Sequence, residues 1–372
     1  MSERRISVVV PYRQRADNLR LALSALAEQT LAADGFEVVV GAMEYSDEYL
    51  DVCREFTDRL PIVSVLSARP WQVGQARNLA LRQATGDVVV LMDVDMALPP
   101  RCLEDLWERH FAYGQNVCVV GQMIDYDNNT GDVTAVDVLP YEHYRKVLAD
   151  LEATGPGDQD PRLSARHVIP WSFAWTALIA LPRSLIVDNG LWFDLGFHGY
   201  GVEDLEWAYR VGRTGTPIVM GREFFGVHLP HVRSVAANKR TEAPNYRYFL
   251  AKWPGPDVEL ACAFGDFEAN ERYTGFRRAL AEVTGRPGGT LTVVRGVVDG
   301  RSELVAGVVP GTTGVLPAGA TDVQVLPLAG LALPYPDGGV DRCRVLDPVH
   351  ALPEPYRERI LAEVRRVGGS GA

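Results

Sequence analysis

The chain has 372 residues, 47% of them hydrophobic and 23% charged, so it is long enough for one sizeable α/β domain and a smaller second one. Its formal net charge of −11 argues against a nucleic-acid partner or an acidic membrane surface. The five cysteines are scattered without a C-x-x-C pair, which predicts free thiols in a reducing cytoplasm rather than a disulfide framework or a zinc site. The apolar run from Val168 to Pro182 contains two prolines and is too short to cross a bilayer, so we expect buried core and no integral membrane segment.

The first third of the chain alternates between apolar runs and amphipathic segments. The pattern predicts strands and helices in turn at Ile6–Pro11, Asn18–Gln29, Phe36–Gly41, Glu48–Leu60 and Ile62–Leu66. This alternation, with short connections, implies a parallel, doubly wound sheet. No G-x-G-x-x-G fingerprint follows the first strand, which argues against a dinucleotide cofactor. The turn after that strand instead carries Arg13 and Arg15, and arginine forks are well suited to phosphates.

A second polar turn follows the next predicted strand, Val88 to Met92, which ends in Asp93-Val94-Asp95. In open α/β sheets ligands collect outside the carboxyl ends of the strands. Two carboxylates two residues apart on one side of a strand suit a hard divalent cation that bridges to a diphosphate. The alternative is a polar strand end that enters a loop.

The segment FHGYGVEDLEWAYR, Phe197 to Arg210, combines closely spaced glycines with two carboxylates, Glu203 and Asp204. Such glycines allow the backbone to approach a ligand closely. The two carboxylates fall in the first turn of an amphipathic segment, where the helix dipole favours anions. An ordinary helix start is the alternative interpretation.

Two histidines, His228 and His231, lie three residues apart in HLPH. Neutral imidazoles are good ligands for Mn²⁺ or a similar ion, and a purely structural role is the alternative for each. The segment that follows is polar and basic for some ten residues before it turns aromatic.

Four stretches in this order, VVVPYRQR, GQARNLALRQATGDVVVLMDVDM, FHGYGVEDLEWAYR and GVHLPH, resemble the GT-A glycosyltransferases. The resemblance is closest to family 2 enzymes and to the C-terminal motif shared by β-1,4-galactosyltransferases and polypeptide N-acetylgalactosaminyltransferases. It implies an α/β GT-A fold, which is a Rossmann-like, doubly wound, mostly parallel sheet. It also implies a metal-dependent, inverting transfer of a hexose from a nucleotide diphosphate sugar, with UDP expected, to an acceptor hydroxyl on a glycan, a peptide or a natural product.

The resemblance also implies roles for individual residues. The donor nucleotide sugar would be bound by Pro11, Tyr12, Arg13, Arg15, Glu44, Arg77 and Asp93. The cofactor would be Mn²⁺ or Mg²⁺, with Asp95 and His228 as ligands and Asp93 and His231 as further candidates. Asp204 would be the general base, and the acceptor would be held by Tyr200, Gly201 and Glu203.

Two stretches relate less simply to the family pattern. Where the second strand of the family usually ends in a pair of acidic residues before a serine, this chain reads Ala42-Met43-Glu44-Tyr45-Ser46. The basic segment after His231 resembles the mobile loop that closes over the donor in the galactosyltransferases, and its Arg233, Lys239 and Arg240 would steer or cover a diphosphate. The alternative for that segment is a solvated loop before a helix.

Beyond Gly255-Pro256 the composition shifts. We expect a catalytic domain over 1–255, with a donor half at 1–100 and an acceptor half at 101–255, a helical linker over 256–289 and a small C-terminal α/β domain over 290–372. The last sixty residues resemble the latter half of a class I methyltransferase, although no glycine-rich cofactor loop is visible upstream. This region could form a homodimer contact. The functional alternatives are a non-catalytic sugar-binding or scaffold protein on the same fold, and a bifunctional protein with a methyltransferase-like tail.

Overall fold

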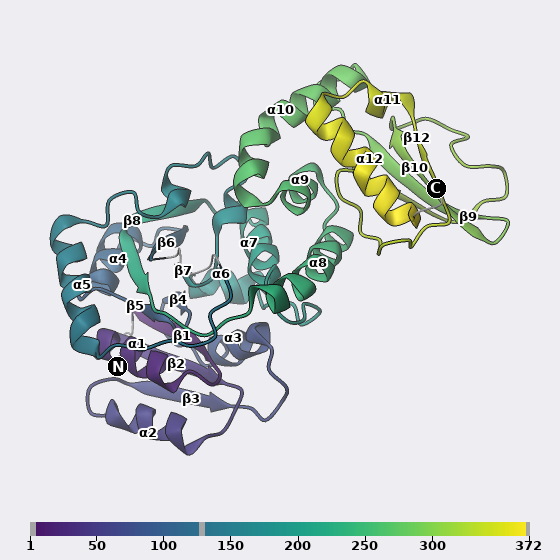
Figure 1. Cartoon of the computed structure of the whole chain (residues 1–372). Coiled ribbons are helices and arrows are strands. Elements are labelled where there is room, and N and C mark those ends of the chain that lie inside the picture. Colours follow the sequence, from purple (N-terminus) through teal and green to yellow (C-terminus); the bar gives the residue numbers. More distant parts are fainter. Residues whose placement is uncertain (1–4, 126–130, 370–372) are drawn as a thin grey trace. The chain divides into compact units, whose positions relative to one another are not determined.

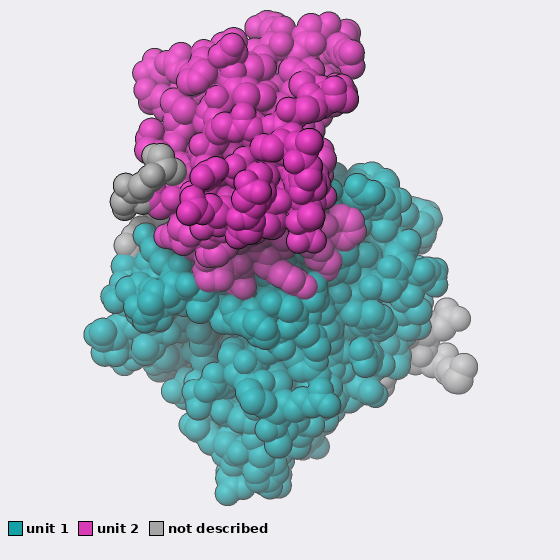
Figure 2. All heavy atoms as spheres, turned by 90° about the vertical axis from the view of Figure 1, so that its right-hand side faces the viewer, with its two compact units in different colours: residues 1–164, 170–242 teal, residues 165–169, 243–372 magenta. Residues whose placement is uncertain are grey.

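The structure of the protein is a computed structural model that describes residues 5–125 and 131–369. The chain forms two compact units, coloured separately in Figure 2. Unit 1 comprises Met1–Ser164 with Pro170–Glu242, and unit 2 comprises Ala165–Ile169 with Ala243–Ala372. The predicted boundary at residue 255 and the predicted linker remain a proposal about domain organisation. No helix among the described residues has the length and apolar character needed to cross a membrane.

Unit 1 is built on an eight-stranded sheet with the order β3-β2-β1-β4-β7-β6-β8-β5 (Figure 1). The strands are β1 (Ile6–Tyr12), β2 (Phe36–Ala42), β3 (Ile62–Leu66), β4 (Val88–Met92), β5 (Met96–Ala97), β6 (Cys118–Ile124), β7 (Leu178–Pro182) and β8 (Ile218–His228). The first four strands are mutually parallel, whereas β7 runs antiparallel to both β4 and β6. The expected α/β fold with a mixed, mostly parallel sheet is therefore confirmed.

Helices accompany this sheet as the sequence pattern predicts for its first half. They are α1 (Ala16–Ala27), α2 (Asp47–Glu55), α3 (Val73–Leu81), α4 (Cys102–His110), α5 (Tyr141–Thr154), α6 (Arg183–Asp188) and α7 (Glu203–Arg213). Strands β1, β2 and β4 are fully buried, in keeping with their largely apolar sequences. Helix α3 packs directly on β1 and β2. A Cβ on Gly41 of β2 would lie 2.0 Å from the carbonyl oxygen of Ala76, so only glycine permits this close helix-to-strand contact.

The basic segment after His231 differs from the expected mobile loop. Residues Val235–Lys252 form one helix, α8, which continues through Pro244. Its first turn is held by the N–H of Val235, which donates to Oδ1 of Asp132 at 2.5 Å, and by a bridge between Val133 and Arg233. The orphan N–H groups of a helix start are stabilised by such oxygen acceptors. The loop interpretation of this segment is therefore wrong from residue 235 onward.

Unit 2 contains a four-stranded sheet with the order β11-β9-β10-β12. Its elements are α9 (Pro256–Phe264), α10 (Asp266–Thr284), β9 (Thr292–Val298), β10 (Arg301–Val308), β11 (Thr321–Leu326), β12 (Arg342–Val345), α11 (Asp347–His350) and α12 (Glu354–Gly368). Strand β9 pairs antiparallel with both β10 and β11, and β10 pairs parallel with β12. The predicted small C-terminal sheet is confirmed.

A buried acidic side chain holds a loop inside unit 2. Glu259 of α9 is 1% exposed, and its carboxylate accepts the backbone N–H groups of Ala329, Gly330 and Leu331 at 2.6–3.0 Å. Burial raises the pKa of Glu259 to about 7, although these N–H donors oppose the rise. Helix α9 is therefore tied to the loop between β11 and β12 through one titratable group.

Candidate active site

The Asp-x-Asp motif lies in a turn rather than on a strand. Strand β4 ends at Met92, and the N–H of Asp93 donates to the carbonyl oxygen of Ala177 at 2.9 Å. The N–H of Met96 then donates to the carbonyl oxygen of Asp93 at 3.1 Å, which closes a tight turn. Because of this turn, the two carboxylates contact different partners. The motif directly follows the strand end, and a shared cation for the two carboxylates stays a prediction.

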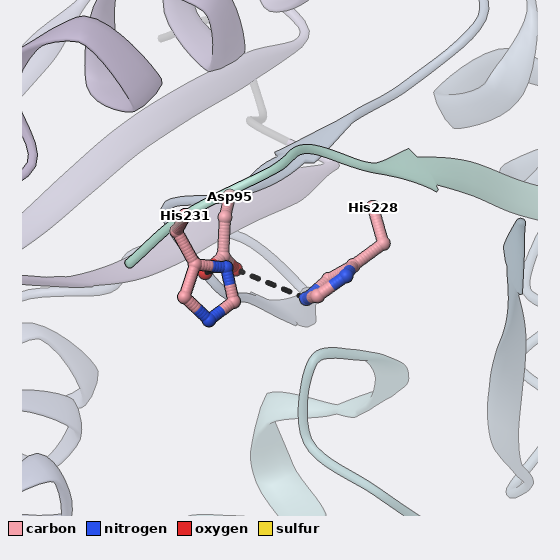
Figure 3. Close-up of side chains that lie close together, drawn as sticks. All are labelled: Asp95, His228 and His231. Carbon is pink, nitrogen blue, oxygen red and sulfur yellow. Dashed lines mark ion pairs between the residues drawn. The ribbon is translucent and has the colours of Figure 1, made fainter. Parts of the chain in front are cut away.

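The side chain of Asp95 lies close to those of two histidines, one at the end of β8 and one just after it (Figure 3). His228 is the last residue of β8 and pairs with Met96 of β5, which places its ring beside the turn. Nε2 of His228 lies 3.9 Å from Oδ1 of Asp95, and Nδ1 of His231 lies 3.1 Å from Oδ2. One ligand atom from each of the three residues lies within 4.8 Å of the others, and the side chains converge in the close-up.

The chemistry of this cluster fits a divalent cation. A carboxylate oxygen with two imidazole nitrogens is a donor set that Mn²⁺ and similar ions accept. Burial lowers the pKa of His231 to about 4 against the attraction of Asp95, and Arg15 and His228 lower it further, so the imidazole is neutral and keeps a lone pair near pH 7. Asp93 is not part of this cluster, because its carboxylate contacts Arg77.

Arg15 also contacts the cluster. It follows β1, and its guanidinium forms an ion pair with Oδ2 of Asp95, the oxygen that His231 approaches. The HLPH turn itself is held by Nδ2 of Asn18 in α1, which donates to the carbonyl oxygen of Pro230 at 3.2 Å. The β1–α1 connection therefore supports both the carboxylate and the histidine turn.

Arg77 joins the two halves of the site. It projects from α3, is 4% exposed, and donates from one terminal nitrogen to Asp93 at 2.9 Å and from the other to Glu203 at 3.0 Å. Its guanidinium lies over the ring of Phe193 at 5.2 Å. Burial disfavours the charge, yet the two carboxylates outweigh it and raise the pKa of Arg77. Arg77 therefore fixes Asp93 and Glu203 relative to each other in this arrangement.

The remaining donor-side residues line the carboxyl ends of β1 and β2. Pro11 and Tyr12 are buried in β1 opposite Gly41 and Ala42. Burial, with the nearby charges of Glu44 and Glu48, raises the pKa of Tyr12 to about 12, so its hydroxyl stays protonated.

The turn after β1 contacts two neighbouring loops. Glu44 accepts the backbone N–H of Gln14 at 3.0 Å, which ties the ends of β1 and β2 together. The exposed Arg13 lies 6.0 Å from the ring of Trp71 in the β3–α3 loop. The turn after β1 is therefore joined to the loops after β2 and β3.

The predicted acceptor residues Tyr200 and Gly201 lie in the loop before α7, and Glu203 is the first residue of that helix. Gly199, Gly201 and Val202 have positive φ angles of 77°, 82° and 74°. A left-handed conformation is unusual for a β-branched residue, and Val202 adopts it at the N-cap of α7. The following Glu203 is buried against Arg77, whereas Asp204 is half-buried and its Oδ1 accepts the N–H of Leu205 at 2.8 Å. Tyr200 is 51% exposed.

The structure thus assembles two linked groups of predicted residues. One is the cation cluster, and the other is the chain from Asp93 through Arg77 to Glu203, with Asp204 beside it. Sequence reasoning missed Phe193, whose ring contacts the Arg77 guanidinium, and also Gln72 and Thr241, which hold the loop before α7. Their contacts join segments far apart in the chain, so no local pattern marks them.

Parts of the chain are similar to known glycosyltransferases. Residues 7–160 match the model of glycosyl transferase family 2. Two validoxylamine A glucosyltransferases, from Streptomyces hygroscopicus subsp. jinggangensis and subsp. limoneus, are each 31% identical over 268 residues, covering 68% of this chain. The match covers only 62% and 58% of those two relatives' own lengths. Among solved structures, a mannosyltransferase from Pyrobaculum calidifontis in complex with GDP-Man and Mn²⁺ is similar over 75% of each chain, with a TM-score of 0.48 and 19% identity.

Proposed function

We propose that the chain, whose residues 7–160 match the model of glycosyl transferase family 2, transfers a hexose from a UDP-linked sugar to an acceptor hydroxyl with a divalent cation, Mn²⁺ or Mg²⁺, as cofactor. The single observation that carries the proposal is the convergence of Asp95, His228 and His231 at the carboxyl edge of the sheet. These residues would hold the cation. When bound, it would act as a Lewis acid that neutralises the charge developing on the leaving diphosphate.

The chain's own residues supply the rest of the reaction. Arg13 and Arg15 carry cationic forks in the turn after β1, where we place the nucleotide and its diphosphate. Asp204 accepts the proton of the acceptor hydroxyl as the oxygen attacks the anomeric carbon opposite the diphosphate. One such displacement inverts the anomeric configuration.

Glu203 and Arg77 take different parts from Asp204. Because the Arg77 guanidinium engages one oxygen of Glu203, this carboxylate is held in a fixed orientation from which it binds acceptor hydroxyls. Arg77 itself is nearly inaccessible, which favours a positioning role over the direct diphosphate contact expected from the family resemblance.

The relatives point to a class of acceptor. Two of them are named for glucosylating validoxylamine A, so we propose glucose as the hexose and a small hydroxyl-rich natural product as the acceptor. The match covers about three fifths of the length of these relatives. The proposed substrates therefore rest on similarity within the aligned region alone.

Unit 2 is not proposed to bind S-adenosylmethionine. Strand β9 leads through the two residues Asp299 and Gly300 into the antiparallel β10, so no glycine-rich strand-to-helix loop follows it. This supports a single transferase activity over the bifunctional alternative. Self-association through this unit stays a prediction.

The test is a screen of UDP-, GDP- and dTDP-sugars with Mn²⁺. Release of the nucleoside diphosphate is measured first without an acceptor and then with validoxylamine A. We expect slow hydrolysis of UDP-glucose that accelerates when the acceptor is added. If none of the donors is turned over under either condition, the non-catalytic sugar-binding interpretation replaces the proposal.

A further inference from the structure

The loop that carries Tyr200 is held from two sides. At the N-cap of α3, Nε2 of Gln72 donates to the carbonyl oxygens of Leu195 at 2.8 Å and Phe197 at 2.7 Å. From α8, Oγ1 of Thr241 accepts the backbone N–H of Tyr200 at 3.0 Å. The loop therefore has one polar anchor at its beginning and a second in the middle.

The Thr241 hydroxyl is oriented to act as an acceptor. Its own hydrogen is donated to the carbonyl oxygen of Asn238, one turn earlier in α8, at 3.0 Å. A hydroxyl has one donor and two lone pairs, so this bond directs a lone pair to the Tyr200 N–H. The hydrogen bond has a defined direction, which a methyl group in the same place cannot supply.

The loop also lies in direct contact with the threonine side chain. A Cβ on Gly199 would come within 2.6 Å of both Cβ and Cγ2 of Thr241. Gly199 has a φ angle of 77°, so glycine is required there for the backbone conformation as well as for the contact. Polar and van der Waals contacts with the same threonine fix adjacent residues of the loop.

We propose that Thr241 is a positioning residue for the acceptor: by fixing the Tyr200 backbone it sets where the exposed Tyr200 ring lies relative to Glu203 and Asp204. This inference rests on the proposed glycosyl transfer and adds α8 to the acceptor side. Aromatic rings bind hydroxylated ligands through their faces, so a displaced ring weakens acceptor binding without touching the donor.

The decisive comparison uses three variants of the full chain. Thr241→Val removes the hydroxyl and keeps the branched shape, and Thr241→Ser keeps the hydroxyl and removes the methyl group. Thr154→Val is the matched control, because the Thr154 hydroxyl also donates to a carbonyl one turn earlier, in α5, at a place remote in sequence from the loop. Steady-state kinetics use UDP-glucose, Mn²⁺ and validoxylamine A, and UDP-glucose hydrolysis without acceptor is measured alongside.

For Thr241→Val we expect the acceptor KM to rise about three- to tenfold, which corresponds to the loss of one hydrogen bond. The KM for UDP-glucose should stay at its wild-type value, and Thr241→Ser should restore most of the acceptor KM. Thr154→Val should match the wild type. An unchanged acceptor KM in Thr241→Val, or an equal rise in the donor KM, overturns the inference.

Amide hydrogen exchange separates this inference from the proposed function. Exchange at Tyr200 should be faster in Thr241→Val than in the wild type and should be protected again in Thr241→Ser. Equal exchange in all variants overturns the inference, even if the protein is an active transferase. Wild-type protein that neither hydrolyses UDP-glucose nor transfers glucose contradicts the proposed function instead, and the exchange measurement still decides whether Thr241 holds the loop.

Discussion

At the scale of single residues, Asp204 and its neighbour Glu203 have contacts that separate their proposed roles. Asp204→Asn keeps the size of the side chain and removes its basicity. We expect kcat to fall by about a hundred- to ten-thousandfold, the range for a positioned general base, while the KM for the donor barely changes. Glu203→Gln should act mainly on the acceptor KM. If Asp204→Asn retained kcat within about threefold of wild type, Asp204 would not be the base.

Arg77 allows a stability test that is independent of activity. Lysine at this position keeps the charge but offers a single nitrogen in place of the two that bond Asp93 and Glu203. Arg77→Lys should therefore lower the free energy of unfolding by roughly 1.5–3 kcal/mol, the worth of one charge-assisted hydrogen bond. The matched control is Arg82→Lys, at an exposed position at the end of α3, which should change stability by less than about 0.5 kcal/mol. Urea unfolding of both variants measures this, and equal losses would contradict the bridging role.

The residues that would hold the metal could be predicted from the sequence, whereas their arrangement in space could not. Asp95, His228 and His231 belong to short motifs, so a local pattern marks them. The link from Arg77 to Glu203 joins residues 126 positions apart and depends on how α3 and α7 pack, which no local pattern encodes. The divergence of Asp93 and Asp95 likewise follows from the turn after β4, where the pairing with β7 stops.

At the scale of elements, two glycines in the loop before α7 allow a prediction about stability. Gly199 and Gly201 both have positive φ angles, so alanine at either position should cost about 1–2 kcal/mol through backbone strain. A Cβ at Gly201 meets nothing within 4 Å, but at Gly199 it would strike Thr241. Gly199→Ala should therefore lower the melting temperature more than Gly201→Ala. Equal shifts would mean that the loop does not rest on α8.

The elements of the first half of unit 1 were predictable, and those of the second half were less so. Strands β1, β2 and β4 are largely apolar, because parallel strands covered on both faces need few polar residues. Strand β8 carries Arg222 and Glu223 in its middle, so its sequence lacks that signal. The basic composition of α8 and its Pro244 favour a loop locally, whereas the contacts of Val235 with Asp132 and of Thr241 with Tyr200 belong to the tertiary fold.

At the scale of the whole molecule, the raised pKa of Glu259 allows us to predict how the free energy of unfolding depends on pH. Its pKa is about 7 in the folded chain and near 4.5 when unfolded, so the unfolded chain loses this proton first as pH rises. The contribution is complete below pH 4.5 and is lost as pH rises through about 7, by roughly 3 kcal/mol in all.

Urea unfolding between pH 4.5 and 8 tests this contribution. Glu259→Gln cannot ionise, so its stability should fall less over this range than that of the wild type. Glu282→Gln, an exposed change in α10, is the control and should follow the wild-type curve. Parallel curves for wild type and Glu259→Gln would show that the carboxylate does not ionise at the expected pH.

The central claim is that a cation held by Asp95, His228 and His231 enables transfer from a UDP-sugar. The most direct measurement is the rate of UDP release from UDP-glucose by the full chain, first after treatment with EDTA and then after addition of Mn²⁺, for the wild type and Asp95→Ala. The account predicts that EDTA abolishes release, that Mn²⁺ restores it in the wild type, and that Asp95→Ala stays inactive with Mn²⁺ because the cation loses its carboxylate ligand. Undiminished release in EDTA, or full activity of Asp95→Ala, would contradict it.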